Sequence, residues 1–135
     1  MSDLLLSIED LRTYYITDES VIHAVNGINL DLRKSESMGL VGESGAGKTT
    51  TAYSIMGLLP KITGKIVGGH ILFQGKELTV ASEEEMRKIR GNQISMIFQD
   101  PMTSLNPILP IGEQIAEVLE IHETKNKRNS LLKAG

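Results

Sequence analysis

The chain has 135 residues, of which 40% are hydrophobic, so it can form one globular domain with a modest core. Its 14 basic and 17 acidic residues give a formal net charge of -3, which argues against nucleic acid as a partner because a phosphate backbone needs a basic face. The absence of cysteine excludes disulfides and thiolate metal sites. Neither a signal peptide nor a bilayer-spanning stretch is expected, so any membrane association should go through a partner protein.

The N-terminal part of the chain predicts β-structure. Residues 4–16 and 21–32 mix apolar and polar side chains as strands do, and the polar segment 17–20 predicts a turn that joins them into a β-hairpin. Residues 37–41 predict a short buried strand. The inward side chains of the hairpin's second strand are expected to be Val21, Ala24, Ile28, Leu30 and Leu32.

A helix and a bent strand are expected next. Apolar residues recur at helical spacing over residues 50–59, and Pro60 is expected to end that helix. The strand predicted over residues 62–73 contains several glycines, which predict a bend or bulge, and residues 74–76 predict a turn.

The remaining elements are a helix, a strand and a second helix. Ser82 and Glu85 have the spacing of a capping box, which predicts a short helix that ends near Gly91. Residues 94–98 predict another buried strand, and residues 111–121 predict a helix. The apolar face of this last helix is expected to carry Ile115, Val118 and Leu119.

The most specific motif is a glycine-rich segment between the strand at 37–41 and the helix at 50–59. Residues 42–49, Gly-Glu-Ser-Gly-Ala-Gly-Lys-Thr, match the pattern G-x-x-x-x-G-K-[ST] at every fixed position. The alternative is a tight connection with an exposed lysine, but the order strand, loop, helix favours a nucleotide-phosphate site. We call residues 42–49 the phosphate loop.

The chemistry of this loop predicts the cofactors ATP and Mg²⁺. Glycines let successive backbone N–H groups turn inward around an anion, and the helix N-terminus and Lys48 add positive charge. The Thr49 hydroxyl is expected to bind Mg²⁺, and Thr50 is expected to approach the α-phosphate through its N–H and hydroxyl. The predicted nucleotide-binding residues of this segment are Gly42, Glu43, Ser44, Gly45, Ala46, Gly47, Lys48, Thr49 and Thr50.

Three segments in order, residues 11–15, 42–50 and 97–101, resemble the ATP-binding subunits of ABC transporters. The resemblance implies that Tyr15, or alternatively Tyr14, stacks on adenine. It also implies that Gln99 is the Q-loop glutamine, a catalytic residue that approaches Mg²⁺ and the attacking water. Residues 100–107 and 111–115 resemble the long loop of dipeptide and oligopeptide importers, with nickel or another solute as the alternative cargo.

A different interpretation takes residues 94–98 with Asp100 as the Walker B strand, whose terminal aspartate holds Mg²⁺. Gln99 intervenes and Pro101 follows, so we favour the Q-loop interpretation. The alternative would make the chain another kind of phosphate-loop NTPase. A soluble kinase or GTPase would need an acceptor or nucleobase site that the sequence does not suggest.

The resemblance implies an α/β fold, with a phosphate-loop NTPase core beside an antiparallel β subdomain, and makes residues 1–135 the N-terminal part of one nucleotide-binding domain. The family's signature segment, its Asp-Glu strand and its switch histidine have no counterpart here, and partner strands for residues 37–41 are expected partly from beyond Gly135. Implied partners are transmembrane permease subunits, a second ATPase subunit and, indirectly, a substrate-binding protein, at the cytoplasmic face of the membrane. The alternative is a truncated product that binds nucleotide without turnover.

Overall fold

The computed structural model describes residues 3–100, 102 and 104–122. The chain divides into two compact units, Met1–Met86 and Arg87–Gly135. The elements are β1 (Leu4–Ile16), β2 (Val21–Arg33), α1 (Lys48–Met56), β3 (Gly64–Phe73), β4 (Lys76–Glu77), α2 (Glu83–Ile89) and α3 (Ile111–His122).

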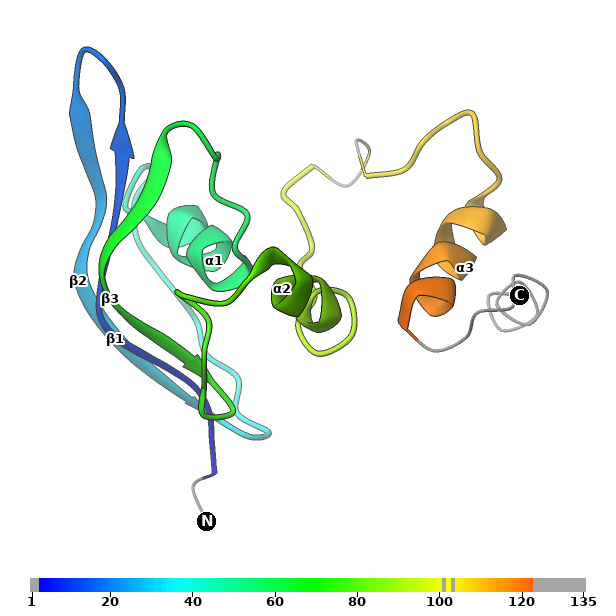
Figure 1. The fold of residues 1–135 in the computed structure, drawn as a ribbon, viewed down its shortest axis with the longest axis horizontal. Coiled ribbons are helices and arrows are strands. Elements are labelled where there is room, and N and C mark those ends of the chain that lie inside the picture. The colour runs from blue at the N-terminus through cyan, green and yellow to red at the C-terminus, as the bar shows by residue number, and fades with distance from the viewer. Residues whose placement is uncertain (1–2, 101, 103, 123–135) are drawn as a thin grey trace. The chain divides into compact units, whose positions relative to one another are not determined.

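The first unit is built on an antiparallel sheet in the order β2-β1-β3-β4. β1 and β2 form the predicted hairpin, and its turn closes with a hydrogen bond of 2.9 Å from the Thr17 N–H to the Ser20 carbonyl. The long strands curve, and α1 lies on the concave side of the sheet (Figure 1). Both the hairpin and its turn are therefore confirmed.

A line of positive-φ residues crosses the three long strands at one level. Asp10 on β1 has φ 45, Gly27 on β2 has φ 84 and Gly69 on β3 has φ 84, and the pairing register shifts beside Asp10 on both sides. A Cβ at Gly69 would lie 2.3 Å from the Asp10 carbonyl oxygen, so the strands approach closely there. Bulges bend and twist a sheet, which explains its curvature around α1 and confirms the predicted bulge in β3.

α1 is shorter than predicted. It ends at Met56 because Gly57 takes a left-handed conformation with φ 62, and the Leu58 N–H donates to the Tyr53 carbonyl at 2.9 Å. Glycine at this position is a common helix terminator. Pro60 therefore follows the end of the helix and does not cause it, contrary to the prediction.

The core of the first unit lies between the sheet and α1, and the hairpin tip projects beyond the helix (Figure 1). Val21, at the tip, is 53% exposed, so its predicted inward position is wrong, and Val25 is buried instead. The principal buried side chains of this unit are Leu6, Ile8, Leu11, Thr13, Val25, Met56, Ile71, Phe73, Leu78 and Met86.

The structure contradicts two predicted strands. Residues 37–41 and 94–98 have no strand conformation, and Val41 and Ile97 are 95% and 93% exposed. A strand needs neighbouring backbone groups for its hydrogen bonds, and no described strand runs beside either segment; a single parallel bridge joins Arg90 to Ile94. Apolar runs of this kind mark the sequence of a buried strand but cannot form one alone.

The predicted capping box begins α2. The Glu85 carboxylate accepts from the Ser82 N–H at 2.9 Å, and the Ser82 hydroxyl accepts from the Glu85 N–H at 3.3 Å. Glu85 also pairs with Lys76 of β4 at 2.9 Å. The hydrogen bond from Lys76, followed by those from Ser82, lowers the pKa of Glu85 from 4.5 to about 2.

We expect the free energy of unfolding to depend less on pH in the Glu85→Gln variant than in wild type. Because the folded-state pKa of Glu85 is lowered, its charge stabilises the folded chain above about pH 4.5, and this contribution is lost as the pH falls toward about 2. Glutamine retains the capping hydrogen bonds without the charge. The free energies of unfolding of wild type and Glu85→Gln should therefore converge through this window, measured by urea unfolding at several pH values.

Glu84→Gln, in the same first turn but outside the capping box, is the matched control. Its difference from wild type should change less with pH over that window. Equal convergence in both variants would contradict a specific role for Glu85.

In the second unit, α3 confirms the helix predicted over residues 111–121, and a side chain of α3 holds the loop before it. The Gln114 side chain accepts from the Asn106 N–H at 2.8 Å and donates to the carbonyls of Asn106 and Leu109, both at 2.9 Å. Ile115 and Val118, predicted on one apolar face, are about half exposed, while Ala116 is buried. No helix among the described residues has the length and apolar character to cross a bilayer.

Candidate functional site

The phosphate loop forms an exposed turn that leads into α1. Gly45 and Gly47 have φ values of 80 and 82, and the Ala46 N–H donates to the Glu43 carbonyl at 3.1 Å. Backbone that alternates in this way turns N–H groups to one side and forms a concavity suited to an anion. The unpaired N–H groups of the first turn of α1 lie directly after it.

Lys48 closes the loop from the first turn of α1. Its ammonium donates to the carbonyls of Gly42 and Glu43, both at 2.5 Å. An ammonium has three donors, so one remains for an oxygen of a bound phosphate. The charge is thus held beside the backbone concavity, as a phosphate site requires.

Strand β2 of the hairpin packs against the phosphate loop, a contact that the sequence did not indicate. A Cβ at Gly47 would lie 2.3 Å from the Ala24 carbonyl oxygen and 3.2 Å from the Val25 side chain. The Thr51 hydroxyl donates to the Gly47 carbonyl at 2.9 Å. The loop is therefore packed against β2 as well as joined to α1, and only glycine fits at position 47.

The threonines of the first turn of α1 differ in exposure. Thr49 is exposed on the same turn as Lys48. Thr50 is only 8% exposed, and its hydroxyl lies 3.2 Å from the Tyr15 hydroxyl. The exposure of Thr49 is compatible with the predicted binding of Mg²⁺. The Thr50 hydroxyl is instead directed toward β1.

The two tyrosines proposed for adenine lie on opposite faces of β1. Tyr15 reaches the first turn of α1. The Tyr14 ring stacks on His23 with centroids 3.9 Å apart, and its hydroxyl donates to Asn26 at 3.1 Å. The structure therefore brings Tyr15, and not Tyr14, to the helix that follows the phosphate loop.

Gln99 belongs to the second unit and lies in an exposed bend. The adjacent Asp100 accepts a hydrogen bond from the Met102 N–H at 3.1 Å, while Pro101 and Thr103 lie outside the described residues. The long-loop segment that suggested a peptide importer is thus described only in part. Gln99 and the phosphate loop therefore belong to different units.

A Mg²⁺ ion fits this site only as a partner of the nucleotide. The described residues contain no group of three or more histidine, aspartate or glutamate side chains that could hold a metal ion. Mg²⁺ is commonly bound through one or two protein oxygens together with substrate phosphates. The exposed Thr49 hydroxyl next to the loop meets that requirement.

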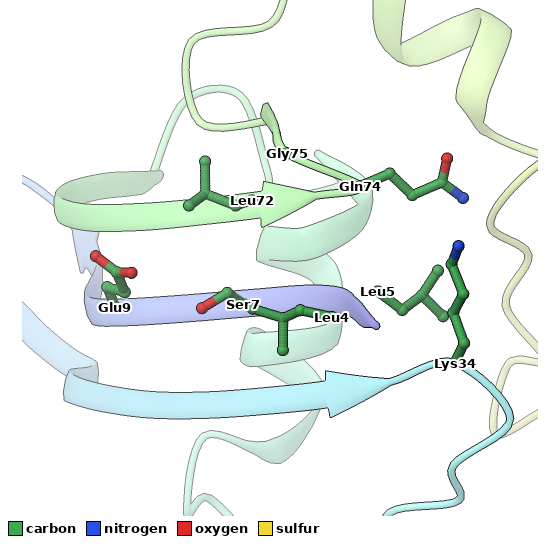
Figure 2. A pocket seen from close by; sticks show the side chains of 8 residues that line it. All are labelled: Leu4, Leu5, Ser7, Glu9, Lys34, Leu72, Gln74 and Gly75. Atoms are coloured by element: carbon green, nitrogen blue, oxygen red, sulfur yellow. The ribbon is translucent and has the colours of Figure 1, made fainter. Parts of the chain in front are cut away.

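A separate hollow lies on the sheet face away from α1. Figure 2 shows its lining residues at the N-terminal end of β1. Its volume is about 390 Å³. Ser7 and Glu9 line it because they alternate along β1 with the buried Leu6 and Ile8, which face α1. None of the loop residues contributes to this hollow, so it is not the phosphate site.

Comparison with known proteins agrees with this geometry. The family model described as "ABC transporter" matches residues 25–134. A probable peptide ABC transporter ATP-binding protein of Sinorhizobium fredii is 50% identical over 98% of this chain and 40% of its own length. The oligopeptide transport ATP-binding protein OppD of Escherichia coli is 49% identical over 93% of this chain and 37% of its own length.

Solved structures show the same fold. The dimeric structure of MJ0796, a bacterial ABC transporter cassette, matches with a TM-score of 0.79 at 22% identity, over 96% of this chain and 53% of that one. The chain spans about 40% of the length of the curated relatives it matches. The fold, the loop and the family match together establish that the chain belongs to the ABC transporter family.

Proposed function

We propose that the chain is the nucleotide-binding part of the ATP-binding subunit of an ABC importer of dipeptides or oligopeptides. The observation that carries the proposal is the phosphate loop, in which Lys48 closes a backbone concavity packed against β2. The names of its relatives, which include peptide and oligopeptide transport ATP-binding proteins, support the cargo class. A related importer of nickel or another solute is the alternative.

In the proposed complex the loop's N–H groups and Lys48 bind the β- and γ-phosphates of ATP. Thr49 holds Mg²⁺, which when bound neutralises charge that develops on the phosphates. Tyr15 stacks on adenine, and Gln99 approaches the ion and the attacking water, as the family resemblance implies. The remaining predicted loop residues line the phosphates through their backbone.

The proposed partners are permease subunits, which hold the ATPase at the cytoplasmic face of the membrane, and a second ATPase subunit. A substrate-binding protein would deliver cargo to the permease. The solved cassette with the same fold is described as a dimer, which supports the second ATPase. The Asp-Glu pair, switch histidine and signature segment that the family uses for hydrolysis have no counterpart in this sequence, so we propose that this chain alone binds ATP without turnover.

Two measurements on the purified chain test the proposal. Calorimetric titration should detect ATP binding that Mg²⁺ strengthens, and inorganic tripolyphosphate should compete with ATP because both engage the loop. Phosphate release should stay at the background rate. Absence of ATP binding would contradict the site, and steady turnover would contradict the Q-loop interpretation of Gln99 and favour a complete NTPase.

A further inference from the structure

Two pairs of hydroxyls join β1 to α1 at matching intervals. Thr13 Oγ1 lies 2.9 Å from Ser54 Oγ, and the Tyr15 hydroxyl lies 3.2 Å from Thr50 Oγ1. Residues two apart on a strand share a face and are about 6.6 Å apart, and residues four apart on a helix share a face and are about 6 Å apart along its axis. Both pairs can therefore form without distortion of either element.

The inner pair is buried and its donors can be assigned. Thr13 is fully buried and Ser54 is 2% exposed. Ser54 Oγ has one proton, which it donates to the Thr50 carbonyl at 2.8 Å, so Thr13 must be the donor to Ser54. Because buried hydroxyls are unfavourable without partners, this pair fixes how far along β1 the helix sits.

The outer pair joins the Tyr15 ring to the turn that carries Lys48. Thr50 is nearly buried, and its hydroxyl is paired with Tyr15, a different use from the phosphate contact expected from the sequence. We propose that Thr50 is a positioning residue, which holds the Tyr15 ring at a fixed distance from the phosphate loop. This inference rests on the proposed function, because it assumes that the ring receives the nucleobase.

The consequence is specificity for a complete nucleoside triphosphate. A fixed separation between an aromatic surface and a phosphate site matches a ligand that has a base at one end and phosphates at the other. Preorganisation of this kind improves affinity because less ordering remains at the moment of binding. Inorganic tripolyphosphate engages the loop but not the ring, so it gains nothing from the Tyr15–Thr50 pair.

The test compares affinities for ATP and inorganic tripolyphosphate in variants of the full chain. In both Thr50→Val and Tyr15→Phe, the affinity for ATP should fall about threefold to tenfold more than the affinity for tripolyphosphate. The double variant should lose no more than either single variant, because both remove the same hydrogen bond. Thr50→Ser, which keeps the hydroxyl, should restore the preference for ATP.

Thr51→Val is the matched control, because it removes a buried hydroxyl of the same helix whose partner is the Gly47 carbonyl. This variant should weaken the binding of ATP and of inorganic tripolyphosphate by the same factor. Equal losses for ATP and tripolyphosphate in Thr50→Val would overturn the proposal and return Thr50 to a phosphate contact or a purely structural role. A wild-type chain that binds neither ligand would instead contradict the proposed function.

Discussion

Gly47→Ala is expected to weaken ATP binding by about 30- to 150-fold, the larger of the two glycine effects in the loop. Its Cβ would lie 2.3 Å from the Ala24 carbonyl oxygen, and its φ of 82 is unfavourable for alanine. Together these cost about 2–3 kcal/mol if the loop keeps its place. The chain is expected to relieve the strain by moving the loop off β2, and the apparent affinity then falls with the population of the competent loop.

Gly45→Ala separates backbone strain from steric contact. Gly45 has nearly the same φ, 80, but a Cβ there meets nothing within 4 Å. Alanine at this position therefore pays only for the left-handed backbone conformation, which costs about 1–2 kcal/mol. Titration of both variants with ATP should therefore give a loss several times smaller for Gly45→Ala. Equal losses would mean that packing of the loop against β2 contributes nothing to binding.

Lys48→Ala is expected to weaken ATP binding by about 10- to 100-fold. Hydrogen bonds to charged groups contribute about 1.5–3 kcal/mol each, and the variant removes both the phosphate contact and the bonds that close the loop on Gly42 and Glu43. The loss should be largest in low salt, because screening weakens the attraction between charges. Titrations with ATP at two salt concentrations measure both effects.

Lys61→Ala is the matched control, since it removes the same charge from an exposed position of the same unit. Its effect on ATP affinity should be small. Comparable losses in the two variants would show that general positive charge, and not the position of Lys48, attracts the nucleotide.

Local signals in the sequence predicted most of the first unit correctly. The hairpin, its turn, the bulged β3 and the capping box of Ser82 and Glu85 were all predicted, because each depends on residues close together along the chain or on backbone that only glycine adopts easily. The end of α1 differs from the prediction, because Gly57 takes a left-handed conformation and ends the helix before Pro60 is reached.

The strands at 37–41 and 94–98 were predicted from their apolar composition. Such composition shows that a segment is suited to a buried strand, but the strand forms only where neighbouring strands supply hydrogen-bond partners. The sequence also gave no indication that the Ala24 carbonyl lies behind Gly47, or that Thr13 and Tyr15 contact Ser54 and Thr50. These contacts join residues more than 20 positions apart. No periodicity or motif encodes them.

The sequence by itself determined the phosphate loop and the family, because G-x-x-x-x-G-K-[ST] specifies a local backbone conformation and a charge. Only the tertiary structure decided that Tyr15 and not Tyr14 reaches α1, that the Thr50 hydroxyl is paired with Tyr15, and that the loop has a wall on β2. The physical reason is that successive side chains of a strand point to opposite faces of the sheet. Which of the two faces meets the helix depends on the bend at Asp10, Gly27 and Gly69 and on the packing of side chains far apart in the sequence.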